Sequence, residues 1–119
     1  MTAPVINPDT RMNKTETKYS IYLDTLISVG EIEEWKFEPV GLRLAGERCF
    51  YHPDFMVVYS DRFEIHEIKA FNRKARKPLI QDDALVKIKV AASQFKWWVF
   101  KIVWFDTYVK HWDCKIMRP

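Results

Sequence analysis

Two short stretches of the sequence carry side chains that together could hydrolyse a phosphodiester bond. The first is Tyr51-His-Pro-Asp54-Phe, and the second, further along the chain, is Glu67-Ile-Lys69. Two carboxylates supply the hard oxygen ligands that Mg²⁺ prefers, and the ion polarises a phosphoryl oxygen and helps to generate hydroxide. A lysine beside them adds positive charge where the transition state gains negative charge. The two stretches therefore predict a metal-dependent phosphodiesterase site, provided that the fold brings them together.

An antiparallel hairpin would bring the two stretches together. Side chains alternate along a strand, so Glu67 and Lys69 point to the same face of an extended segment. A tight turn over 60–62 would return the chain so that Asp54 lies roughly opposite residues 67–69. The alternative interpretation is ordinary local structure. A Pro-Asp step is common in turns, and an acid two residues before a lysine is often an exposed ion pair of little energetic weight.

Hydrophobic periodicity predicts the elements that must position these residues. Asn13 and Glu16 have the spacing of a capping box, and Gly30 suits the position after a helix end. Pro39 is expected to interrupt the first strand. In chain order we expect a helix over 14–29, strands over 35–44, 49–59 and 63–69, a loop over 71–80, a helix capped by Asp82 or Asp83, a strand over 97–105, and a last strand or tail over 108–117.

The order of these elements predicts an α/β fold. Residues 97–105 are apolar at odd and even positions alike, apart from Lys101. This pattern is typical of a strand buried on both faces inside a sheet. A mixed β-sheet flanked by helices, in the order helix, three strands, helix, strand, is the expected architecture. The expected organisation is a flexible N-terminal arm over 1–12 followed by a single domain over 13–119.

Composition agrees with a globular domain that meets an anionic partner. The 119 residues are 48% hydrophobic and 15% aromatic, and the tryptophans are expected mostly in the core. Residues 1–50 hold six Lys/Arg and eight Asp/Glu, a net of −2, whereas residues 51–119 hold thirteen and eight, a net of +5. No apolar run approaches the roughly 18 residues that span a bilayer. Cys49 and Cys114 match no metal spacing, so we expect reduced thiols in a cytoplasmic protein with no membrane partner.

The chain resembles the PD-(D/E)xK nuclease superfamily, which has a restriction-endonuclease-like core. Within that superfamily, it is similar in particular to small phage and prophage nucleases described as endonuclease-I-like or Holliday-junction-resolvase-like. Four stretches carry the resemblance, in the family's order and across nearly the whole chain: Arg11-Met-Asn-Lys-Thr-Glu16, Tyr51-His-Pro-Asp54-Phe, Glu64-Ile-His-Glu67-Ile-Lys69 and Asp82-Asp-Ala-Leu-Val-Lys87-Ile-Lys89-Val-Ala-Ala. Relatives usually have glycine directly after the lysine, where this chain has Ala70.

The resemblance implies a role for each matched residue. Asp54 and Glu67 would be the central metal ligands, joined by the main-chain carbonyl of Ile68, and Lys69 would be the catalytic lysine. Glu16 would be the first-helix acid that reaches the metal or its water. The implied cofactor is Mg²⁺, with Mn²⁺ as an alternative. Phosphate contacts would come from Lys87 and Lys89 of the second helix, and the basic loop is predicted to add Arg73, Lys74, Arg76 and Lys77.

The expected function is that of a metal-dependent DNA endonuclease, selective for junctions or branches and acting in DNA recombination or processing. Symmetric cutting of two strands needs two sites, so a homodimer is expected. A host-cell cytoplasm would be its compartment if the protein is phage-encoded. Three alternatives stay open: a catalytically inactive nucleic-acid-binding module of the same fold, action on RNA or single-stranded DNA, and a structural phage protein. Glu16 has a second interpretation as the glutamate of the capping box, and His66 is expected to be a packed or surface residue and not a base.

Overall fold

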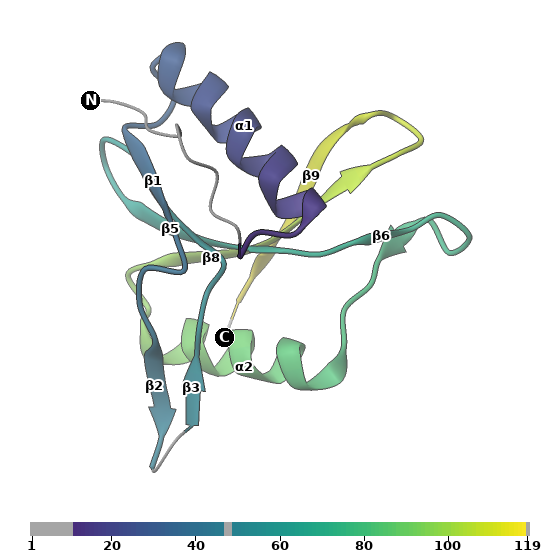
Figure 1. The fold of residues 1–119 in the computed structure, drawn as a ribbon. Coiled ribbons are helices and arrows are strands. Elements are labelled where there is room, and N and C mark those ends of the chain that lie inside the picture. The colour runs from purple at the N-terminus through teal and green to yellow at the C-terminus, as the bar shows by residue number, and fades with distance from the viewer. Residues whose placement is uncertain (1–10, 47–48, 119) are drawn as a thin grey trace.

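The computed structural model describes residues 11–46 and 49–118, and it places two helices on opposite sides of a central sheet (Figure 1). The elements in chain order are α1 (Lys14–Ser28), β1 (Glu34–Phe37), β2 (Leu42–Ala45), β3 (Cys49–Tyr51), β4 (Phe55–Val58), β5 (Phe63–Ile68), β6 (Phe71–Asn72), β7 (Lys77–Pro78), α2 (Asp82–Gln94), β8 (Val99–Asp106) and β9 (His111–Met117).

The central sheet has five strands in the order β1-β4-β5-β8-β9. β1, β4 and β5 are antiparallel neighbours, β8 runs parallel to β5, and β9 returns antiparallel to β8. Parallel neighbours need a long crossover connection, and here α2 lies in the segment between β5 and β8. The fold is therefore mixed α/β, and the predicted order of helix, three strands, helix and strand matches the principal elements.

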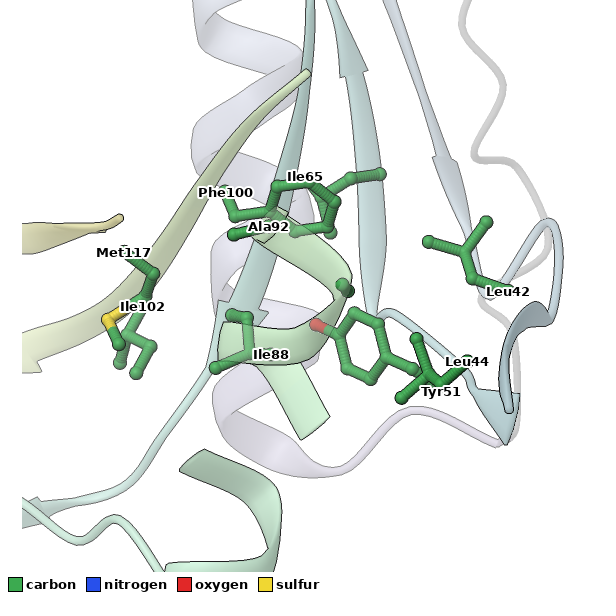
Figure 2. Packing of buried hydrophobic residues seen from close by; sticks show 10 residues of the cluster. Leu42, Leu44, Tyr51, Ile65, Ile88, Ala92, Phe100, Ile102 and Met117 are labelled. Carbon is green, nitrogen blue, oxygen red and sulfur yellow. The ribbon is translucent and has the colours of Figure 1, made fainter. Parts of the chain in front are cut away.

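Each face of the sheet has its own hydrophobic core. The core on the α2 side consists of Leu42, Leu44, Tyr51, Ile65, Ile88, Ala91, Ala92, Phe100, Ile102 and Met117 (Figure 2). The core on the α1 side consists of Tyr19, Leu23, Ile32, Phe55, Val57, Ile68 and Val103. Side chains alternate along β5 and β8, so each strand contributes residues to both cores. This explains why the sequence of β8 is apolar at both parities, as expected for a strand inside a sheet.

The start of α1 is fixed by the predicted capping box. The Asn13 side chain accepts a hydrogen bond from the Glu16 amide (2.8 Å), and the Glu16 carboxylate accepts one from the Asn13 amide (2.9 Å). Gly30, with a φ of +81°, follows the last turn in a conformation that disfavours other residues. Both helix ends therefore lie where the sequence predicts them.

Asn13→Ala is expected to destabilise the protein by about 1 kcal/mol, because it removes one half of the capping box. Urea denaturation at pH 7 measures the change. Asn72→Ala, whose side chain accepts a hydrogen bond in an exposed turn, is the control and should have a smaller effect. Equal losses in the two variants would contradict a special role for the cap.

Two of the predicted strands are each divided in two. Pro39 lies between β1 and β2, and Pro53 lies between β3 and β4, and proline lacks the N–H that continues a strand ladder. β2 and β3 leave the central sheet and form a separate two-stranded sheet that contacts α2. The break at Pro53 places Asp54 directly before β4.

Four other local predictions need correction or refinement. Residues 71–80, predicted as a loop, contain the antiparallel hairpin of β6 and β7. Gln81 is the N-cap of α2 and makes no side-chain capping bond, so the predicted cap at Asp82 or Asp83 is wrong; both acids lie in the first turn. The C-terminal segment forms a strand, β9, and Trp97 is 74% exposed instead of packed in the core.

The ends of the domain prediction fall partly outside the described residues. Of the predicted arm over 1–12, only residues 11 and 12 are described, and Met12 packs against the core on the α1 side. Arg11 forms an ion pair with Glu38 (3.3 Å). In the described part of the chain, no helix has the length and apolar character needed to cross a lipid bilayer.

Candidate functional site

The hairpin of β4 and β5 brings Asp54 opposite Glu67. In this antiparallel pair, Phe55 faces His66, so the next position outward pairs Asp54 with Glu67. The Asp54 carboxylate also accepts a hydrogen bond from the amide of Ile68 (2.8 Å). The two carboxylates therefore sit side by side where β4 begins and β5 ends.

Two side chains hold the Glu67 carboxylate, one at each oxygen. The Tyr51 hydroxyl donates a hydrogen bond to Oε1 (2.7 Å), and the Lys69 ammonium lies 3.4 Å from Oε2. Tyr51 is buried in the core on the α2 side (Figure 2). Burial and the charge of Glu67 raise the pKa of Tyr51 far above its ordinary value, so its hydroxyl stays protonated and acts as a donor.

Asp54 lies in a negative and partly desolvated environment. Burial, followed by the negative charge of Glu67, raises the pKa of Asp54 from 3.8 to about 8, although the hydrogen bond from Ile68 acts in the opposite direction. Glu16 raises the same pKa and Lys69 lowers it. An additional positive charge at this point would relieve the repulsion and return Asp54 to its ionised form.

Glu16 serves the capping box and also lies close enough to act on Asp54. One of its carboxylate oxygens accepts a hydrogen bond from the Asn13 amide, and the residue is 8% exposed. Its charge contributes to the raised pKa of Asp54. The capping interpretation is thus observed, and the same residue adds to the negative potential beside the two carboxylates.

The donor atoms at this point suit a hard divalent cation. Mg²⁺ is usually bound by one or two carboxylates together with water and substrate phosphate, not by a complete protein cage. Asp54 and Glu67 supply two such carboxylates, and the Ile68 main chain is adjacent to both. Within residues 11–46 and 49–118, no group of three or more His, Cys, Asp or Glu side chains has the arrangement of a metal cage.

The residue after the lysine is compatible with its position. Among the described non-glycine residues, positive φ occurs at Glu38, Arg76 and Lys110, and Ala70 is not one of them. Alanine is therefore unstrained at this position. The main chain continues from Lys69 into β6 without a conformational requirement for glycine.

The predicted phosphate-binding residues fall into two groups. Lys87 and Lys89 are exposed on α2, and neither forms an ion pair with Asp54 or Glu67. Arg73, Lys74, Arg76 and Lys77 are exposed on the hairpin of β6 and β7, which follows Lys69 directly in the chain. Both arginines lie against the ring of Tyr108, at 5.6 Å and 4.2 Å from its centroid.

Sequence reasoning assigned no role to two features near the site. Tyr51 belongs to the quoted motif, yet nothing in its spacing indicates a bond to Glu67. The second feature is a buried cluster on the α1 side, in which Glu64 accepts hydrogen bonds from Arg62 (2.7 Å), His66 (2.8 Å) and Lys101 (2.9 Å). A lysine inside an apolar strand is a signal that could have revealed this cluster, because a buried ammonium needs a partner.

Tyr51→Phe is expected to weaken metal binding about 10- to 100-fold, because residues that orient a ligating carboxylate act on metal affinity by that factor. The rise in melting temperature on titration with Mg²⁺ measures the effect. Tyr22→Phe, at a partly exposed position on α1, is the control and should respond as the wild type. An unchanged Mg²⁺ response in Tyr51→Phe would contradict the positioning role.

The site thus combines two adjacent carboxylates, an ammonium group, a buried hydroxyl donor and a basic hairpin that continues from the lysine. Such an arrangement can hold a divalent cation and present positive charge to a bound phosphate. Comparison of the chain with protein-family models, with curated proteins and with solved structures found no match in any of the three.

Proposed function

We propose that this protein is a metal-dependent DNA endonuclease whose site consists of Asp54, Glu67 and Lys69. The observation that carries the proposal is the register of β4 and β5, which sets Asp54 opposite Glu67 with the Lys69 ammonium 3.4 Å from the same carboxylate. Phosphodiester hydrolysis needs this combination of hard anionic ligands and a nearby positive charge.

In the proposed site, Asp54 and Glu67 hold Mg²⁺ or Mn²⁺ together with the main-chain carbonyl of Ile68. When bound, the cation would supply Lewis-acid polarisation of the phosphoryl oxygen and of the attacking water. Tyr51 orients Glu67, and the Ile68 amide orients Asp54. Lys69 would balance the charge that develops on the phosphate, and Glu16 would orient water from the start of α1.

The proposal includes a restriction-endonuclease-like core. Its support is the topology: an N-terminal helix, three antiparallel strands, a crossover that contains a helix, and a parallel fourth strand. Asp54 lies directly before the second of these strands, β4, and Glu67 lies on the third, β5. The resemblance of the four sequence stretches points in the same direction.

DNA with branches or junctions is the proposed substrate, and a homodimer is the proposed assembly. A small domain has little surface for reading base sequence, so recognition through phosphates and DNA shape fits better. Two sites related by a two-fold axis would cut both strands of a symmetric junction. Sedimentation of the protein with and without a four-way junction measures the assembly, and a monomer on the junction would contradict it.

The experiment is a cleavage panel. Labelled four-way junction, flap, duplex and single-stranded DNA, and a matched RNA, are incubated with Mg²⁺, Mn²⁺ or EDTA. We expect metal-dependent cutting of DNA that is lost in Asp54→Ala and in Lys69→Ala, with both variants folded by circular dichroism. Lys36→Ala, at an exposed position on β1 that has no part in the proposed site, is the control and should still cut. Junction binding with no cutting of any substrate would contradict the enzyme and indicate an inactive binding module.

A further inference from the structure

A second contact surface lies beyond the carboxylates, where two turns join into one projection. The first is the hairpin of β6 and β7, and the second is the turn over 107–110 between β8 and β9; Figure 1 shows both extending from the same side of the molecule. We call these two segments, residues 71–78 and 107–110, the basic prong.

Tyr108 joins the two halves of the basic prong. Its hydroxyl donates a hydrogen bond to the main-chain carbonyl of Arg73 (2.9 Å), and its ring packs edge-on against Phe71 with the ring centroids 6.2 Å apart. The guanidinium of Arg76 lies 4.2 Å from the Tyr108 ring centroid, within the range of a cation–π contact. One aromatic side chain therefore makes the hairpin and the turn a single unit.

Each half of the prong is also held by its own hydrogen bonds. The Asp106 carboxylate accepts hydrogen bonds from the amides of Tyr108 (2.8 Å) and Val109 (3.2 Å). The Asp106 main-chain carbonyl accepts one from the amide of Lys110 (2.7 Å). The Asn72 side chain accepts the amide of Ala75 at the hairpin tip (3.0 Å). A surface that is ordered before binding loses little conformational entropy when a partner arrives.

The charge of the prong suits a polyanion. Its cations are all exposed: Arg73, Lys74, Arg76, Lys77 and Lys110. Over the described ranges, no carboxylate forms an ion pair with any of the five. The nearby acid, Asp106, is engaged in the turn. The prong therefore offers five unneutralised positive charges on a preformed scaffold.

Exposed apolar groups accompany these charges. Tyr108 is 45% exposed and Val109 is 55% exposed at the tip of the turn. Phosphate binding alone requires neither. Aromatic rings stack on unpaired bases, and aliphatic side chains insert as wedges beside base steps that are already open. Cations around an exposed ring are the combination that a single-stranded nucleic acid or an open base step requires.

The position of the prong relates it to the proposed site. β6 begins two residues after Lys69, and β6 contacts β8. A nucleic acid whose phosphate lies at Asp54, Glu67 and Lys69 can thus continue directly onto the prong. This geometry favours a nucleic acid over an anionic membrane, for which continuity with the carboxylates would have no use.

We infer that the basic prong binds the unpaired or unstacked nucleotides that flank the scissile phosphate, with Tyr108 stacking on a base. This inference rests on the proposed function and deepens it, because it assigns the residues that hold the nucleotides beside the scissile phosphate. Arg73, Lys74, Arg76, Lys77 and Lys110 hold the backbone on either side of the stacked base. Val109 lies beside the ring as the wedge.

Binding to a fluorescent flap DNA, to a blunt duplex of the same length and to phosphatidylserine vesicles tests the inference, in EDTA so that no cleavage occurs. Tyr108→Ala is expected to weaken flap binding about ten-fold or more, because a base stacked on an aromatic ring contributes on the order of 1–3 kcal/mol. Tyr108→Phe keeps the ring and should retain most of the affinity. Trp97→Ala, another exposed aromatic, is the control and should bind as the wild type.

Charge is tested separately on the hairpin of β6 and β7. The double variant Lys74→Ala/Lys77→Ala is expected to lower the slope of log affinity against log salt by about 2, since each lost phosphate contact lowers it by about 1. These exposed positions leave the Tyr108 contacts in place, so this measurement stands even if Tyr108→Ala fails to fold. An unchanged salt slope would overturn the role of the hairpin.

The outcomes separate this inference from the proposed function. Loss of flap binding in Tyr108→Ala, in a protein that cuts no substrate, would support the prong and refute the enzyme. Cutting that depends on Lys69, together with unchanged flap binding in Tyr108→Ala, would refute the prong alone. Tighter binding to vesicles than to flap DNA, or equal losses in Tyr108→Ala and Trp97→Ala, would also overturn it.

Discussion

Asp54→Asn is expected to abolish metal-dependent cleavage and at the same time to stabilise the metal-free protein at neutral and alkaline pH. Asparagine keeps the oxygen that accepts the Ile68 amide, and it replaces a charged oxygen beside Glu67 by a donor. It removes one of the two anionic metal ligands. A loss of about 4 kcal/mol of transition-state stabilisation corresponds to a rate about a thousand-fold lower.

The gain in stability follows from the raised pKa of Asp54. This pKa is about 8 in the folded protein, against 3.8 ordinarily, because burial and the charge of Glu67 disfavour the ionised form. A carboxyl group whose pKa is higher in the folded state stabilises while it is protonated. Its contribution is complete below about pH 4 and is lost as the pH rises through about 8. The asparagine side chain has no carboxyl group to ionise, so the variant keeps its stability as the pH rises through about 8.

Urea denaturation in EDTA between pH 4 and pH 9 measures the effect. We expect the variant to exceed the wild type by on the order of a few kcal/mol at pH 9, because the folded protein disfavours the ionised form of Asp54, and to match it near pH 4. Mg²⁺ should stabilise the wild type and not the variant. Asp83→Asn, in the exposed first turn of α2, is the control. A variant less stable than the wild type at pH 9 would contradict the negative environment of Asp54.

Glu64→Ala is expected to be the most destabilising single change outside the hydrophobic cores. Glu64 is 1% exposed and accepts hydrogen bonds from three side chains, those of Arg62, His66 and Lys101. The Tyr19 hydroxyl lies 2.6 Å from the other ring nitrogen of His66 and so belongs to the same cluster. Removal of the carboxylate leaves Lys101 without its partner inside the sheet. Breaking a buried ion pair in this way costs about 3–5 kcal/mol.

The protonation states of this cluster follow from its contacts. Burial lowers the pKa of His66, so the ring is neutral. A neutral ring that donates from Nε2 to Glu64 must accept the Tyr19 hydroxyl proton at Nδ1. Burial alone would raise the pKa of Glu64, but the hydrogen bonds from His66, Lys101 and Arg62 outweigh it and lower the pKa from 4.5 to about 2.

The lowered pKa of Glu64 gives a pH dependence opposite to that of Asp54. A carboxyl group whose pKa is lower in the folded state stabilises when ionised. Its contribution is present above about pH 4.5 and is lost as the pH falls towards 2. Glu64→Gln should therefore flatten the loss of stability between pH 4.5 and pH 2, as measured by thermal unfolding. A slope as steep as that of the wild type would contradict this assignment.

The control for Glu64 is an exposed acid in a comparable ion pair. Glu34→Ala removes a partner of Lys36 at 3.8 Å, with both side chains more than half exposed. Such a surface pair contributes at most about 1 kcal/mol. Urea denaturation at pH 7 should thus separate Glu64→Ala clearly from Glu34→Ala, and similar losses in the two would contradict the buried network.

Local rules were sufficient to predict the arrangement of Asp54, Glu67 and Lys69. Strand alternation puts Glu67 and Lys69 on one face, and the turn over 60–62 sets the register that brings Asp54 opposite Glu67. The ends of α1 follow from Asn13 and Gly30, whose side-chain and backbone chemistry act within a few residues.

Features that depend on distant contacts were not predictable in the same way. The hairpin of β6 and β7 has no apolar periodicity, and its partner Tyr108 lies far along the chain. Tyr51 reaches Glu67 because β2 and β3 leave the central sheet, a consequence of two prolines whose separate effects combine only in three dimensions. Lys101 carried a usable signal, although the sequence does not specify which acid it meets.

The most direct test of the central claim is the single-turnover cleavage rate of a labelled four-way junction by the wild type and by Lys69→Met, each with Mg²⁺ and with EDTA. Methionine keeps the length of the side chain and removes its charge. The proposed site predicts cutting by the wild type with Mg²⁺, none with EDTA, and a rate at least about a hundred-fold lower in Lys69→Met, the loss expected when one group that stabilises transition-state charge is removed. Equal rates in the two proteins, or cutting that persists in EDTA, would contradict it.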